Sequence, residues 1–72
     1  ANLMSTADYD ARHIELERDV ASAKSLLTEL KQKLENARDE FEKRRLEVNI
    51  EDVTAQLKDF EYELSEMTHG KE

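Results

Sequence analysis

The sequence lacks cysteine, proline and tryptophan, and Gly70 is its only glycine among 72 residues. Without cysteine there is no disulfide framework and no thiolate site in the chain. Two Phe and two Tyr are its only aromatic residues, which is too little bulky apolar material for a compact globule. Since no proline or internal glycine interrupts a helix between Thr6 and Thr68, these absences favour an all-α fold.

Long apolar runs and a coherent basic face are missing as well. No run approaches the ~18 residues that a membrane span needs, and no signal-peptide pattern opens the sequence. Charged residues make up 40% of the chain, with a net charge of −7, and the bases of residues 31–45 are interleaved with acids. We therefore expect no membrane and no nucleic-acid partner, and an intracellular location in the cytoplasm or on the cytoskeleton.

What the sequence does contain is the Glu, Lys, Leu, Arg and Ala composition of a long helix. Ser5 or Thr6 can cap its start, and Gly70 supplies a residue that commonly follows a helix end. The prediction is a helix over residues 6–68, ~95 Å long at 1.5 Å per residue. Residues 1–5 are expected to be a disordered lead or a remnant of protein production, and residues 69–72 a disordered tail.

An apolar stripe follows this helix with alternating spacings of three and four residues, the 3.5-residue period of a left-handed coiled coil. Such a stripe is the surface through which helices pair, so its members are the predicted oligomer interface. They are Leu16, Val20, Ala23, Leu27, Leu30, Leu34, Ala37, Phe41, Ile50, Val53, Leu57, Phe60, Leu64 and Met67.

The stripe changes phase between residues 42 and 49, because heptad position a moves from Phe41 to Ile50, nine residues instead of seven. Two interpretations fit this break. In one, the helix continues and only the supercoil adjusts locally. In the other, Asn49 caps a second helix and the chain forms a hairpin, with arms of about 42 and 19 residues. The second leaves much of the first stripe without an internal partner, so we expect one continuous helix.

Charges beside the stripe favour a parallel homodimer. In that arrangement a g residue faces the e residue five positions later on the partner. Arg12 with Glu17 and Asp19 with Lys24 then attract, whereas Lys33 with Arg38 repels. The core residues do not follow the Ile-at-a, Leu-at-d dimer pattern, so trimers, tetramers and antiparallel pairs remain alternatives.

The sequence contains no recognisable catalytic or cofactor-binding arrangement. A Gly-rich phosphate loop and a Ser-His-Asp set are both missing. His13 and His69 are ~84 Å apart at helical rise, so they cannot share a metal within one continuous helix. We expect no enzyme activity, no catalytic residue, no cofactor and no metal. Tyr62, which lies off the stripe, is a candidate for an exposed contact.

Two runs within residues 34–57 resemble the rods of known filament proteins. The runs are Leu-Glu-Asn-Ala-Arg-Asp-Glu-Phe-Glu at 34–42 and Ile-Glu-Asp-Val-Thr-Ala-Gln-Leu at 50–57. They are similar to intermediate-filament and lamin rods and to myosin and paramyosin rods. The resemblance implies a filament or scaffold role and no transferable functional residue.

Together these observations predict a structural coiled-coil oligomerisation segment of a cytoskeletal, filament or scaffold protein, with self-association as a homodimer. The alternative is an adaptor or regulatory coiled coil that docks onto a separate protein partner, such as another helical protein, either as a single helix or as a helical hairpin.

Overall fold

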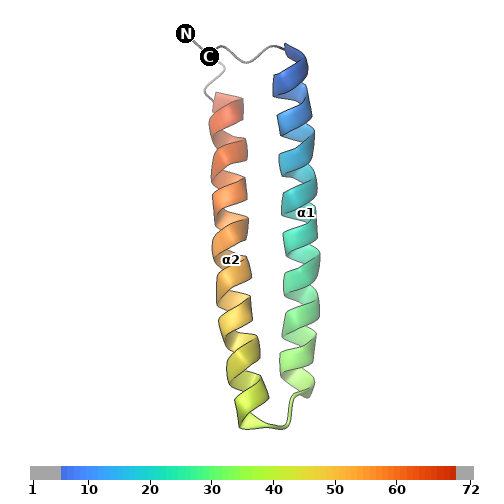
Figure 1. The fold of residues 1–72 in the computed structure, drawn as a ribbon, viewed down its shortest axis with the longest axis vertical. Helices are drawn as coiled ribbons and strands as arrows, with labels where there is room; N and C mark the ends of the chain where they lie inside the picture. The colour runs from blue at the N-terminus through green and yellow to red at the C-terminus, as the bar shows by residue number, and fades with distance from the viewer. Residues whose placement is uncertain (1–5, 70–72) are drawn as a thin grey trace.

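The computed structural model describes residues 6–69, with side chains through Met67, as two antiparallel helices joined by a short turn (Figure 1). Helix α1 spans Thr6–Asn36 and helix α2 spans Glu40–His69. The molecule measures 53 × 16 × 16 Å. The all-α class is confirmed for the described residues. The predicted lead at residues 1–5 and residues 70–72 of the predicted tail lie outside them.

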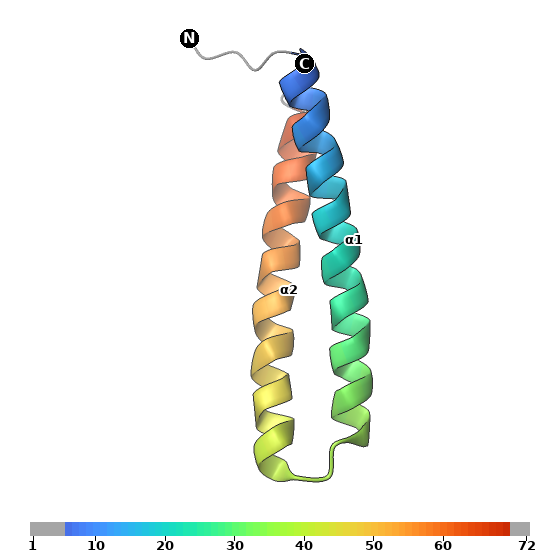
Figure 2. The same cartoon turned by 45° about the vertical axis from the view of Figure 1, so that its right-hand side comes forward.

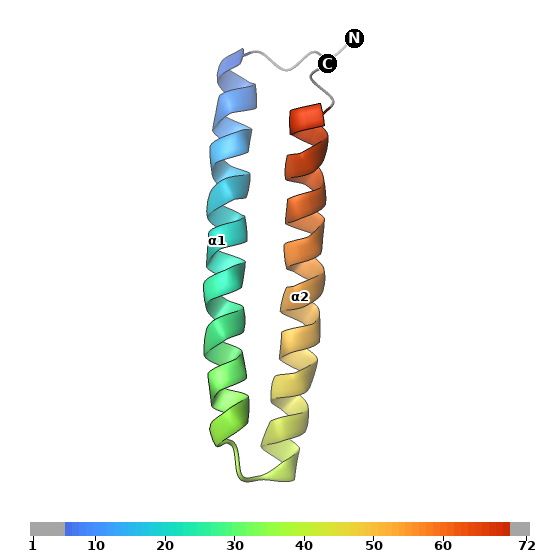
Figure 3. The same cartoon turned by 180° about the vertical axis from the view of Figure 1, so that it is seen from behind.

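The prediction of a single continuous helix is wrong. The chain reverses at residues 37–39, so that the start of α1 and the end of α2 lie at the same end of the molecule (Figures 1 and 3). The two helices have 31 and 30 residues. Because the arms are nearly equal, each apolar layer of the first half has a partner layer in the second. The unequal arms that counted against a hairpin do not arise.

Asp39 explains why the second helix begins where it does. Its side-chain Oδ2 accepts a hydrogen bond from the backbone N–H of Glu42 at 3.2 Å, and its carbonyl oxygen accepts one from Lys43 N–H at 3.0 Å. This is the N-cap arrangement, in which a short acidic side chain satisfies a free N–H of the first turn. At the end of α1, Ala37 N–H donates to the Leu34 carbonyl at 3.3 Å and tightens the last turn.

The predicted alternative hinge was also misplaced. Asn49 does not cap a helix but lies inside α2, with its side chain exposed. Residues 42–49 are helical throughout. The change of heptad phase therefore reflects the turn that precedes them, because the stripe of α2 has to be aligned with α1 across the hairpin and not along one continuous helix.

A contact between the open ends of the helices fixes their register. The Tyr9 hydroxyl donates a hydrogen bond to the Met67 carbonyl at 2.9 Å, although 58 residues separate them in sequence. This pairing places Ala23 level with Val53 and Leu30 level with Leu46, and these four residues form the buried core cluster. The helices stay alongside one another in the rotated views (Figures 2 and 3).

Candidate interaction surface

The seam between the helices contains two parallel rows of apolar side chains with different burial. We call the first the inner row, and it occupies heptad position d in both helices. Its central members are Leu16 at 0% exposure, Leu46 at 6%, Ala23 at 7%, Leu30 at 8% and Val53 at 9%. These are all the buried residues of the described chain, so the hairpin's own core is essentially this row.

The second row occupies heptad position a, and we call it the outer row. All its aliphatic members are half-buried, and four of them pack against the core cluster on their inner side. In a symmetric two-stranded coil, positions a and d share the burial. Here the most deeply buried side chains are those at position d, and the outer row is left half-buried along one side of the hairpin, which we call the groove. It is hollowed at its turn end, where Leu34, Val48 and Ile50 line a pocket. The outer row consists of Val20, Leu27, Leu34, Ile50, Leu57 and Leu64.

The structure thus brings most of the predicted interface residues together within one chain. Leu16, Ala23, Leu30 and Val53 are buried, and the outer row, Ala37, Phe60 and Met67 are half-buried. Phe41 is the exception, with 74% of its surface exposed. Its place on the stripe assumed that the α1 heptads continue past residue 40, but Phe41 lies in the first turn of α2, whose stripe follows a different phase.

An ion pair crosses the hairpin on the side of the inner row. Arg12 donates from Nε to Glu63 Oε2 at 2.8 Å, with a second bond from Nη2. It also pairs with Glu15, one turn along its own helix. The hydrogen bond to Glu63 is the largest of the influences that raise the pKa of Arg12 above its ordinary value. Because these groups are exposed, the pair contributes more to the register of the helices than to their stability.

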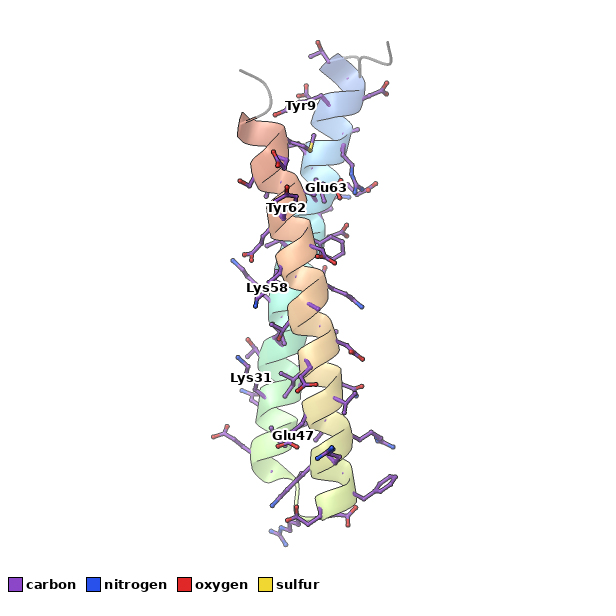
Figure 4. All side chains as sticks on the ribbon, turned by 90° about the vertical axis from the view of Figure 1, so that its left-hand side faces the viewer. Tyr9, Lys31, Glu47, Lys58, Tyr62 and Glu63 are labelled. Carbon is purple, nitrogen blue, oxygen red and sulfur yellow. The ribbon has the colours of Figure 1, made fainter. Side chains whose placement is uncertain are left out.

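The edges of the groove along the outer row carry opposite charges. The charged residues at the flanking heptad position e are Glu17, Lys24 and Lys31 on α1 and Glu47 and Glu61 on α2, all five of them exposed. Lys24 Nζ lies 4.0 Å from Glu61 Oε2, a pair that reaches across the row. Lys31 and Glu47 lie toward the turn end of the hairpin, on neighbouring helices (Figure 4). The α1 edge is therefore basic from Lys24 toward the turn, with the acidic Glu17 nearer the open end, and the α2 edge is acidic.

Several large apolar side chains lie outside both rows. Ile14, Leu26 and Val48 are 51%, 42% and 45% exposed. Tyr62 is 68% exposed on the outer face of α2 (Figure 4), as its position off the stripe predicted. A hydrogen bond to Glu66 raises the pKa of the Tyr62 hydroxyl. These side chains are scattered, so they do not form a single patch like the groove.

Few of the described side chains form an arrangement typical of a catalytic or metal-binding site. His13 is half-buried beside Tyr9, with ring centroids 6.2 Å apart, and its Nδ1 lies 3.4 Å from Glu17. No group of three or more His, Asp or Glu side chains in the described part of the chain is placed to hold a metal ion. Nor does either helix combine the length and apolar character required to cross a membrane.

Sequence reasoning missed the turn and the charge pairs that go with it. The available signal was Asp39 followed three residues later by Glu42, a pattern typical of a helix start. A second signal was the match of Arg12 with Glu63, since g positions face each other when two helices run antiparallel. The difference in burial between positions a and d could not be predicted in this way. It depends on how far each helix is rotated about its axis toward its partner, which the sequence does not specify.

Comparison with known proteins adds no relative: no protein-family model matches the chain, and no curated protein or solved structure matches it significantly.

Proposed function

We propose that this chain is a non-catalytic interaction module that binds other helices through the groove along its outer row. The observation that carries the proposal is the row of six aliphatic side chains that the hairpin leaves only half-buried along one side. A continuous apolar strip of this kind, with charged edges, is typical of a protein-binding groove. Another helix supplies what the strip lacks, because an apolar helix face laid in the groove completes its burial.

The hairpin also changes the form that such a role takes. The inner row is already occupied within one chain, so it is not available to pair with a second chain as in a rod. The 53 Å length of the hairpin is little more than half that of the extended helix. The proposal therefore favours an adaptor or regulatory role, in which a helical partner docks locally on the hairpin. It does not favour a role as a long spacer along a filament.

A second candidate is a segment of a filament, cytoskeletal or scaffold protein that self-associates inside the cell. It is supported by the resemblance of residues 34–57 to filament rods and by the same outer row, which a second copy of the chain can also cover. In this version hairpins pack side by side, and the homodimer contains four helices.

Sedimentation equilibrium and circular dichroism test the proposal together. The isolated hairpin is expected to be weakly stable, and its helix content should rise when its outer row is covered. A rise of helicity with chain concentration favours self-association, and a rise only on adding a helical partner favours the adaptor role. A monomer with a high, concentration-independent melting temperature that Leu27→Gln and Leu57→Gln leave unchanged contradicts both.

A further inference from the structure

We infer that the groove binds one further amphipathic helix, about 22 residues long, with acidic residues on one flank and basic residues on the other. The inference rests on the proposed function and specifies the partner. It follows from the length of the outer row, from the burial of the two rows and from the charges at the edges of the groove.

The expected length of the partner helix follows from the length of the outer row. Between His13 and Leu34 the half-buried positions recur at every heptad on α1, a distance of ~32 Å at helical rise. Leu64, Leu57 and Ile50 line the same stretch from α2. A helix of three heptads covers this groove from end to end.

The difference in burial between positions d and a indicates a place for a third helix. In a three-helix coil, each helix directs one of its core positions toward each of its two neighbours, and both lie in the common core. In this hairpin position d is turned toward the other helix and position a toward the open groove. The two helices are thus oriented as two members of a three-helix bundle, and the third place lies over the outer row.

The same geometry counts against a second copy in the groove. Stacking two hairpins face to face makes four helices, in which a core-facing helix buries a third position beside a and d. On α1 that position is occupied by Glu17, Lys24 and Lys31. Burying these charges costs free energy unless each is closely paired. A single third helix leaves them at the rim, where they remain in contact with water.

The edge charges define the flanks of the partner. Lys24 and Lys31 on α1 attract acidic residues, and Glu47 and Glu61 on α2 attract basic residues. The 4.0 Å contact between Lys24 and Glu61 is weak enough to be replaced by one pair on each side of the incoming helix. A helix with like charges on both flanks is repelled at one edge.

Three synthetic helices with the same Leu and Ile stripe test the inference against the whole hairpin. One has Glu on one flank and Lys on the other, one has Glu on both and one has Lys on both. By fluorescence anisotropy, the mixed helix should bind roughly ten-fold more tightly than either of the others, from two or more exposed charge pairs. Exchanging the two flanks of the mixed helix is not a useful control, because the exchanged helix can bind in the reverse direction.

Charge-reversal variants of the hairpin make the test specific to this groove. Lys24→Glu with Lys31→Glu makes both edges acidic, so preference should shift to the helix with Lys on both flanks. Arg18→Glu with Lys33→Glu is the matched control. It makes the same change of net charge at exposed positions away from the groove, and it should leave the preference for the mixed helix in place.

The outcomes separate this inference from the proposed function. Equal binding of all three helices, with amide-exchange protection along the outer row, overturns the charged-flank partner but keeps the helix-binding role. Dimers of the hairpin that protect the outer row and exclude all three helices overturn the third-helix inference in favour of a second copy. Absence of both peptide binding and self-association overturns the inference and the proposed function together.

Discussion

Leu27 and Leu30 are neighbours on the stripe, but they differ in how much of their side chains the hairpin buries. Leu30 belongs to the inner row with 8% exposure, whereas Leu27 is half-buried in the outer row. The sequence treats both as core positions of equal weight. Their difference in burial therefore tests whether the helices face each other as described.

Leu30→Ala should lower the free energy of unfolding by about 2–4 kcal/mol, because it removes buried methyl groups and leaves a cavity. Leu27→Ala should cost less in the monomeric hairpin, since part of its side chain is in water already. Urea unfolding followed by circular dichroism measures both. Glu29→Ala, an exposed neighbour, is the control and should change little. A larger cost at Leu27 than at Leu30 means that the two rows have been assigned the wrong way round.

Asp39 is the single residue with the clearest role in the turn. Asp39→Ala removes the acceptor for the Glu42 N–H, and we expect it to destabilise the hairpin by about 1 kcal/mol. Asp39→Asn should retain most of the stability, because the amide oxygen can accept the same bond. The neighbouring substitution Arg38→Ala serves as control in the same unfolding experiment. If Asp39→Ala and Arg38→Ala cost the same, the cap does not define the start of α2.

At the scale of the elements, the turn should appear in amide hydrogen exchange. The amides of residues 38–41 lie at or before the first turn of α2, where the N–H groups of a helix have no partner within that helix. They should exchange faster than those of residues 42–49, which lie within α2. In a continuous helix, residues 38–41 are bonded like their neighbours and no local minimum of protection exists. Uniform protection from residue 30 to residue 50 therefore contradicts the turn.

The helical content and the apolar stripe could be predicted from the sequence, because both depend on local composition and spacing. The direction of pairing could not be read from the stripe, since a 3.5-residue period is the same for parallel and antiparallel helices. Edge charges do distinguish the two directions. In an antiparallel pair, g residues face g residues and e residues face e residues, which brings together the opposite charges of Arg12 with Glu63 and of Lys31 with Glu47. A parallel pairing of g with e does not compare these residues.

The turn was difficult to predict for a different reason. Residues 36–42 contain no proline or glycine, and most of them are acceptable within a helix. Asp39 becomes a cap only because packing of the two long arms stabilises the reversal, a non-local effect. Phe41 shows the consequence: its spacing fits the stripe of α1, yet its position after the turn leaves it exposed.

At the scale of the whole molecule, the hairpin has a small core for its length. The buried residues of the described chain are the five central members of the inner row, while the outer row contributes only part of its surface. Helices of this size gain most of their stability from packing an apolar face. A molecule that leaves one apolar row half-covered is therefore suited to gain stability from a partner, which is the basis of the proposed function.

The central claim is that the chain folds back on itself, and a distance between spin labels at Ala11 and Gln56 tests it most directly. Both positions are exposed, one on each helix. In the hairpin register, Gln56 lies ~14 Å along the axis from the level of Ala11, across a helix separation of about 8–10 Å. Dilution with unlabelled chain removes distances between molecules. The hairpin predicts about 15–25 Å between the labels, given these two components, whereas a separation near the ~67 Å of a continuous helix contradicts it.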